Sequence, residues 1–96
     1  MDFKGATLAQ YDQVIQRMGL VRGGPMPSGG LSHWVTETAD GLHICDLWES
    51  REQFDTFAEE QIGPFSREAG IEQPPEVSFF EVHNYLLSPS AEVPAA

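Results

Sequence analysis

The sequence predicts a small α+β domain in which an antiparallel sheet carries helices on one face. Helical and strand-like patterns succeed one another along the chain, and only a short turn separates the two central strand-like segments. A chain of 96 residues with 41% hydrophobic side chains is long enough for one domain around one core. We expect this single domain over residues 1–86 and a disordered tail over residues 87–96.

The first helix is predicted over residues 7–19, because apolar side chains recur there at three- and four-residue spacing: Leu8, Tyr11, Ile15 and Met18. Thr7 and Gln10 have the spacing of a capping box, and Gly19 suits a left-handed helix end. Residues 1–6 leave room for a short first strand only. Residues 22–30 hold four Gly and two Pro, which predicts a loop.

Residues 31–38 and 42–49 predict a β-hairpin, since both segments are rich in β-branched and aromatic side chains and Ala39-Asp40-Gly41 lies between them. Two positions apart on the second strand, Asp46 and Trp48 must lie on the same face of the sheet.

The length of the turn decides what faces these two residues. A two-residue turn at Asp-Gly places His33 opposite Trp48 and diagonal to Asp46. A three-residue loop with a glycine bulge places Trp34 opposite Asp46 and moves His33 to the other face. The Ala39 that precedes Asp-Gly favours the three-residue loop.

A second helix is predicted after Ser50, which has capping-box spacing with Gln53. We expect Gly-Pro at residues 63–64 to interrupt it, so that residues 65–69 form a separate turn or two. Residues 77–86 are rich in Val, Phe and Tyr and predict a last strand.

With a short first strand, the predicted order is βαββαβ, the ferredoxin-like arrangement. Both faces of the predicted strands mix apolar with polar side chains, whereas an ordinary solvent-facing sheet surface is polar. A domain of this size also buries only roughly 60 to 65% of its unfolded surface. We therefore expect a second copy of the chain to cover the face without helices.

Composition narrows the possible partners. The formal charge of −10 repels nucleic-acid backbones and anionic lipid headgroups, so we expect neither nucleic acid nor membrane as a partner. The single Cys45 excludes an intrachain disulfide and fits a reducing cytosol. No long apolar run follows Met1, so neither a secretory signal nor a membrane span is predicted, and we expect a cytoplasmic protein.

Three motifs resemble the dimeric α+β barrel superfamily, and within it the small proteins related to antibiotic biosynthesis monooxygenases. They are Asp40-Gly41-Leu42, the segment of residues 46–54 in which a strand ending in Trp-Glu-Ser opens directly into a helix, and Val82-His83-Asn84. The likeness spans about residues 5–86. It departs from the family at residues 1–4, where the family has a full first strand.

This resemblance implies a homodimer whose two sheets pack into a barrel, with a pocket between the helices and the sheet of each subunit. It also implies a cofactor-independent enzyme, without metal or flavin, that acts on a hydrophobic aromatic or polyketide-like small molecule. Monooxygenase members of the family oxidise electron-rich aromatic substrates with dioxygen. Other members of the superfamily bind heme, or isomerise, cyclise or degrade small molecules.

The residues that could carry chemistry are few. His33 and His83 suit proton transfer near neutral pH, and Asp46 is an acid in mid-strand that must be paired or have a raised pKa. Each of them could equally be a structural residue with satisfied hydrogen bonds. We expect a substrate pocket to be lined by five further residues: Trp34, Trp48, Asn84, Tyr11 and Phe57. The loop of residues 22–30 is either a lid over this pocket or a plain connector.

A metal site from His33, His83 and a carboxylate lacks the spacing of known zinc motifs, and we expect none. Three interpretations stay open. The chain is an enzyme that forms an anion of its substrate with a side-chain base, a protein of the same fold that binds a small ligand such as heme, or an interaction module whose polar cluster is structural.

Overall fold

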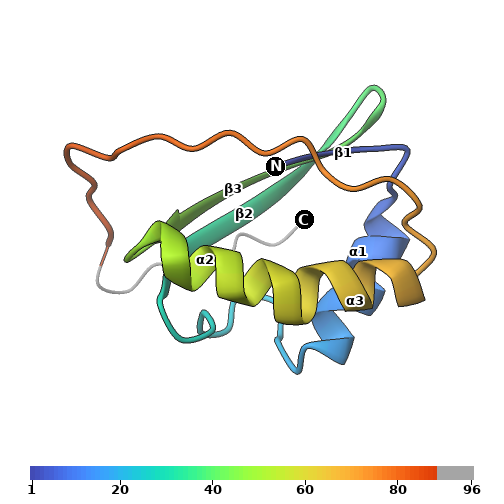
Figure 1. Ribbon diagram of the computed structural model, residues 1–96, viewed down its shortest axis with the longest axis horizontal. Coiled ribbons are helices and arrows are strands. Elements are labelled where there is room, and N and C mark those ends of the chain that lie inside the picture. Colours follow the sequence, from blue (N-terminus) through green and yellow to red (C-terminus); the bar gives the residue numbers. More distant parts are fainter. Residues whose placement is uncertain (89–96) are drawn as a thin grey trace.

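The computed structural model describes residues 1–88 as an α+β domain with one antiparallel sheet, in the strand order β1-β3-β2. The strands are β1 (Asp2–Lys4), β2 (Gly30–Thr38) and β3 (Gly41–Trp48). Helices α1 (Leu8–Arg17), α2 (Arg51–Phe57) and α3 (Gly63–Glu68), with the π-helical segment η1 (Ala58–Ile62), lie on one side of the sheet (Figure 1). The predicted α+β class is confirmed. The predicted tail lies, except for residues 87 and 88, outside the described residues.

Helix α1 begins where the sequence predicts. Both halves of the capping box are present: Gln10 N donates to Thr7 Oγ1 at 3.2 Å, and Thr7 N donates to Gln10 Oε1 at 3.0 Å. Beyond the helix Gly19 has a φ of 77°, the left-handed conformation expected at a helix end. Within α1, Val14 is buried and Tyr11 reaches the sheet.

The hairpin turn differs from both predicted forms. Thr38 pairs with Gly41, so the turn consists of Ala39 and Asp40 alone. Gly41 belongs to β3 because β1 passes very close to it: a Cβ at this position would overlap the Phe3 carbonyl oxygen. The glycine is required for strand contact and not for the turn, and the favoured three-residue loop is wrong.

This register places His33 directly opposite Asp46 and Trp34 directly opposite Cys45. Directly paired residues share a face of an antiparallel sheet. The inner face, which the helices cover, therefore carries His33 and Asp46, together with the buried Leu42 and Ile44. The outer face carries Trp34 and Cys45, which are exposed.

The second helix begins at the predicted cap, where Gln53 N donates to Ser50 Oγ at 3.2 Å. It then continues from α2 through η1 into α3, so the predicted interruption at Gly63-Pro64 is wrong. Gly63 N donates to the Ala58 carbonyl across a widened π-helical turn. That turn directly precedes Pro64 and accommodates its ring, which in a regular α-helix would clash with the carbonyl four residues earlier.

The core lies between the helices and the inner face of the sheet. It consists of side chains from every layer: Phe3, Ala6, Val14, Leu42, Ile44, Phe54, Ile62 and Ile71. The polar site described below lies on the same inner face, toward the end of β3 where α2 begins.

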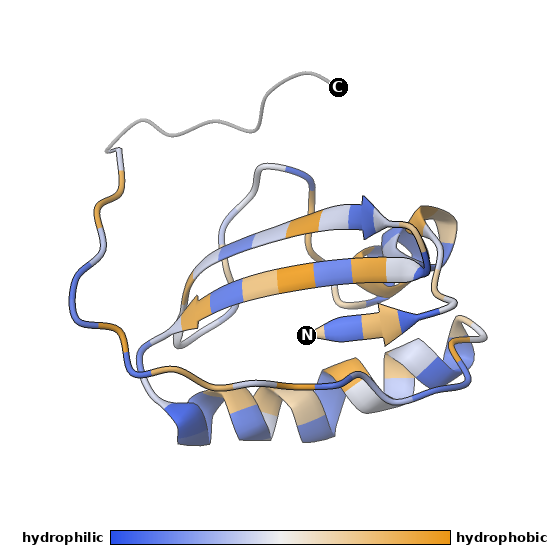
Figure 2. Cartoon of the chain, turned by 90° about the horizontal axis from the view of Figure 1, so that it is seen from above, coloured by the Kyte–Doolittle hydropathy of each residue, from blue (hydrophilic) through white to orange (hydrophobic). Residues whose placement is uncertain are grey.

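The predicted last strand over residues 77–86 is not a strand in this chain. Glu76 forms an isolated antiparallel bridge with Asp2, and the chain then continues extended without strand pairing within the described residues. Because β1 has only three residues, it offers no backbone partner beyond this bridge. Figure 2 shows apolar residues along this exposed segment, and it also shows that no helix covers the outer face of the sheet.

Candidate functional site

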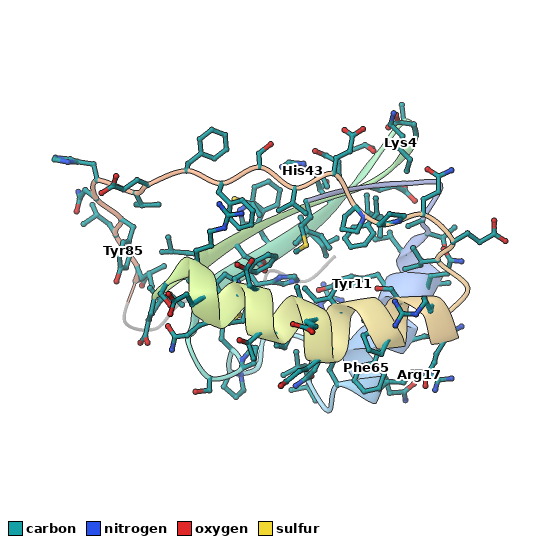
Figure 3. The ribbon with its side chains drawn as sticks, in the orientation of Figure 1. Lys4, Tyr11, Arg17, His43, Phe65 and Tyr85 are labelled. Atoms are coloured by element: carbon teal, nitrogen blue, oxygen red, sulfur yellow. The ribbon has the colours of Figure 1, made fainter. Side chains whose placement is uncertain are left out.

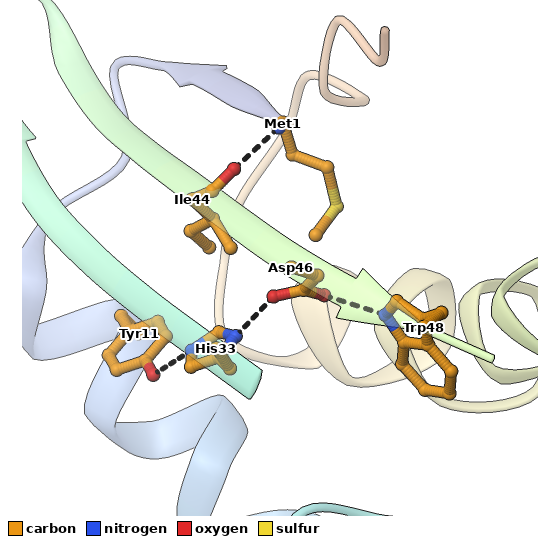
Figure 4. Close-up of polar contacts among 6 residues, drawn as sticks. All are labelled: Met1, Tyr11, His33, Ile44, Asp46 and Trp48. Atoms are coloured by element: carbon orange, nitrogen blue, oxygen red, sulfur yellow. Dashed lines mark hydrogen bonds and ion pairs between the residues drawn. The ribbon is translucent and has the colours of Figure 1, made fainter. Parts of the chain in front are cut away.

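Four polar side chains on the inner side of the sheet form one continuous hydrogen-bonded cluster (Figure 4). Tyr11 Oη lies 2.6 Å from His33 Nε2, and His33 Nδ1 lies 2.6 Å from Asp46 Oδ1. Trp48 Nε1 donates to the second carboxylate oxygen, Asp46 Oδ2, at 3.1 Å. We call this set of residues the Tyr11–His33–Asp46–Trp48 cluster.

The elements around the cluster explain its geometry. Asp46 and Trp48 are two residues apart on β3, and the hairpin register sets His33 of β2 opposite Asp46. The amphipathic stripe of α1 brings Tyr11 against His33, and the two rings are nearly parallel, with centroids 5.9 Å apart and planes 6° apart. The mid-strand acid is thus paired, as its position in the sequence requires.

The side chains of Asp46 and His33 make these contacts largely out of water. The Asp46 side chain is 9% exposed and the His33 side chain 24% exposed. Two donors reach the Asp46 carboxylate, one on each oxygen, so its charge is compensated although it lies largely out of water.

The hydrogen-bond directions select one neutral form of His33. A carboxylate only accepts hydrogen bonds, so Nδ1 carries the proton and donates it to Asp46. Nε2 then has a free lone pair and accepts from the Tyr11 hydroxyl. In this form Nε2 is the ring nitrogen with an accepting lone pair, and Asp46 lies on the opposite side of the ring, at Nδ1.

The Tyr11 phenol is held in its protonated form. Burial raises its pKa to about 12, and the negative charges of Asp46 and Asp12 act in the same direction. At neutral pH Tyr11 therefore keeps its phenolic hydrogen, which it donates when His33 Nε2 is unprotonated.

An aromatic wall adjoins the cluster. The Trp48 ring lies 5.7 Å from the Phe54 ring in an edge-to-face arrangement and 5.1 Å from the Phe57 ring, measured between centroids. Phe57 also lines an open groove of about 470 Å³ between the loop before β2 and helix α2. The groove thus begins one aromatic contact away from the cluster, and the role of Phe57 in lining a substrate pocket stays a prediction.

The loop of residues 22–30 contributes Pro27 and Ser28 to this groove. Most of the remaining lining is polar and comes from α2 and its surroundings: Ser50, Glu52, Gln53, Thr56, Glu60 and Gln61. None of these residues is predicted from the sequence as a site residue. Their helical spacing is recognisable, but the loop that faces them carries no periodic pattern that would place it against α2.

The other predicted site residues lie elsewhere in the single chain. Trp34 is on the outer face, 51% exposed, with its ring 5.5 Å from that of His43. His83 and Asn84 are exposed on the extended segment after Glu76 and do not join the cluster within residues 1–88.

Among the described residues, no group of three or more His, Cys, Asp or Glu side chains is placed to hold a metal ion. No helix in that part of the chain is long and apolar enough to cross a membrane.

No family model, curated protein or solved structure matches this chain. The resemblance to the monooxygenase-related barrel proteins therefore stays a prediction. What the chain itself provides is the geometry of the cluster and of the groove beside it.

Proposed function

We propose that this chain is a cofactor-independent enzyme that removes a proton from a hydrophobic phenol or enolisable ketone, with His33 and Asp46 as its acid–base pair. The resulting anion is electron-rich. It then reacts with dioxygen, as in enzymes of the antibiotic biosynthesis monooxygenase type, or it cyclises or isomerises.

One observation carries this proposal. The His33 ring is held between a carboxylate and a phenol by two hydrogen bonds of 2.6 Å each. An imidazole oriented in this way by a buried acid is the arrangement that general bases use near neutral pH. Trp48 and Phe57 supply aromatic surface beside it for a planar ring.

The base step can be tested without knowing the natural substrate. Anthrone is an enolisable polycyclic ketone, and the exchange of its methylene hydrogens in deuterium oxide, followed by NMR without oxygen, reports proton abstraction alone. We expect the wild-type protein to accelerate this exchange. His33→Gln and Asp46→Asn should each reduce the acceleration by about 10²- to 10⁴-fold while the circular dichroism spectrum is kept. In air, anthrone and dioxygen should then give anthraquinone and water.

The same experiment separates the other interpretations. A ligand-binding protein would quench its tryptophan fluorescence on adding anthrone without accelerating exchange. An interaction module would do neither. Exchange that is unaffected by both substitutions would remove His33 and Asp46 from the reaction.

We also propose that the protein is a homodimer in which the segment after Glu76 packs on the second copy. Seven large apolar side chains of this segment are at least 40% exposed in the single chain: Val77, Phe79, Phe80, Val82, Tyr85, Leu86 and Leu87. The outer face of the sheet, which carries the exposed Trp34, is a second uncovered surface of the single chain. Two copies related by a two-fold axis can cover both surfaces at once.

Light scattering tests the assembly, and a mass near twice the monomer's 10.6 kDa is expected. Phe80→Asp and Leu86→Asp should shift the protein toward the monomer, since these side chains are 85% and 89% exposed in one chain and are not needed for its core. Gln13→Asp, at an exposed position of helix α1 outside this segment, is the control that adds the same charge. Cys45 is exposed in one chain, so its reaction with a thiol reagent should speed up in the monomeric variants. A wild-type monomer at micromolar concentration would contradict the proposal.

A further inference from the structure

Both ring nitrogens of His33 are already in use. Nδ1 is bonded to Asp46 and Nε2 to the Tyr11 hydroxyl, each at 2.6 Å. A ligand therefore meets no free lone pair on the imidazole. A phenolic hydroxyl has lone pairs in addition to its single hydrogen, and within the described residues Tyr11 Oη has no other hydrogen bond than the one to His33.

We propose that Tyr11 is a catalytic residue whose Oη atom exchanges the proton with the ligand, and that His33 acts through it. This inference rests on the proposed function. It changes the role of Tyr11 from a residue that lines the substrate pocket to one that carries the proton. From the sequence Tyr11 is expected only as a lining residue, because the helical stripe does not reveal which strand residue it meets.

The step balances as a double proton transfer. The acidic C–H or O–H bond of the ligand breaks, its proton goes to Tyr11 Oη, and its electron pair stays on the ligand as an enolate or phenolate. In the same event the phenolic hydrogen of Tyr11 passes to His33 Nε2, which makes His33 an imidazolium paired with Asp46. The reverse sequence returns a proton to the product.

Tyr11 is a neutral phenol before and after this exchange. That suits its surroundings, because burial and the Asp46 and Asp12 charges raise its pKa to about 12 and make a free phenolate unfavourable. A mechanism that stores a negative charge on Tyr11 would work against the same charges. The Tyr11 and His33 rings are nearly parallel, with planes 6° apart, and the Oη and Nε2 atoms lie 2.6 Å apart.

In an alternative role, the Tyr11 hydroxyl only blocks Nε2 until a ligand displaces it. The two roles predict opposite effects of Tyr11→Phe, which removes only the hydroxyl. If Tyr11 carries the proton, the variant loses activity. If Tyr11 only blocks Nε2, the variant frees this nitrogen and keeps or gains activity.

The experiment measures anthrone methylene exchange for wild type, Tyr11→Phe, His33→Gln and Tyr85→Phe. Tyr85 is the only other tyrosine and lies far from Tyr11 on the exposed segment (Figure 3). We expect Tyr11→Phe to lower the maximal rate by about 10²-fold or more, as His33→Gln does, and Tyr85→Phe to leave it unchanged. A Tyr11→Phe rate at or above wild type, with His33→Gln inactive, overturns this inference and leaves the proposed function standing. A wild type no faster than buffer overturns the proposed function, and this inference with it.

A second readout needs no ligand. Diethyl pyrocarbonate modifies unprotonated imidazole nitrogens, and peptide mass spectrometry follows His33 separately from His43 and His83. His33 should be slow to react in the wild type and much faster in Tyr11→Phe, while the other two histidines are unchanged. Equal rates for His33 in both proteins would show that Tyr11 does not occupy Nε2, and would overturn the inference.

Discussion

Trp48 is expected to stabilise the domain in two separable ways. Its indole N–H donates to the largely buried Asp46 carboxylate at 3.1 Å, and its ring packs against Phe54 and Phe57. Losing a hydrogen bond to a charged group costs about 1.5 to 3 kcal/mol. Removing a buried Trp side chain altogether costs about 3 to 5 kcal/mol. Because Trp48 is only partly buried, we take the lower end of both ranges.

Two substitutions separate the contributions. Trp48→Phe keeps an aromatic ring but removes the donor, and should lower the free energy of unfolding by about 1.5 kcal/mol. Trp48→Ala removes both, and should lower it by about 3 kcal/mol. Urea titrations followed by circular dichroism at constant protein concentration give these values, provided that the slope with denaturant is unchanged.

A double-mutant cycle with Asp46→Ala then isolates the hydrogen bond. In the Asp46→Ala background, Trp48→Phe should cost about 1.5 kcal/mol less than in the wild type, because the acceptor is already gone. Equal costs in both backgrounds would refute the claim that the indole N–H stabilises Asp46. If Trp48→Ala costs no more than Trp48→Phe, the ring does not pack as described.

Two further predictions concern stability. Gly41→Ala should lower the free energy of unfolding by about 1 to 3 kcal/mol, because its Cβ would meet the Phe3 carbonyl. Gly63→Ala, at a helical position, should instead raise the free energy of unfolding by about 0.5 to 1 kcal/mol. Thermal melts in which Gly41→Ala is as stable as the wild type would contradict the close contact with β1. The pKa of Tyr11 is raised from 10.0 to about 12, so the folded state holds this proton more tightly, and the associated stability is complete below pH 10.0 and lost as the pH rises toward 12. Urea titrations across this range should show a steeper loss for wild type and Tyr85→Phe than for Tyr11→Phe, and identical slopes would argue that the phenol is not buried.

Local signals predicted much of the fold. Both helix starts were readable because Thr7 and Ser50 cap the helices through side chains three residues from their partners. Asp46 and Trp48 were placed on one face because a strand has a period of two. The wrong predictions concern positions where contacts between distant segments of the chain determine the structure. The close approach of Phe3 fixes the position of Gly41 in β3, and the resulting turn is one that the Asp-Gly signal does not predict.

The cluster was predictable only in part for the same reason. His33 and Asp46 were candidates by residue type, but their pairing depends on the register, and the contact of His33 with Tyr11 depends on how α1 packs against the sheet. The prediction of a last strand over residues 77–86 is wrong for a different reason. Its composition is that of a strand, yet the single chain offers it no neighbour beyond the three residues of β1. Strand propensity does not reveal whether a pairing partner exists.

The central claim is that Asp46 and Tyr11 hold a neutral His33 with its proton on Nδ1 and an accepting lone pair on Nε2. Nitrogen-15 NMR of the histidine rings measures this directly, with the His33 signals assigned by comparison with His33→Gln and recorded at a pH where the ring is neutral. We expect a protonated Nδ1 and an unprotonated Nε2 for His33 in the wild type, and a loss of this preference in Asp46→Asn. A His33 ring protonated on Nε2, or one that exchanges freely between the two forms, would contradict it.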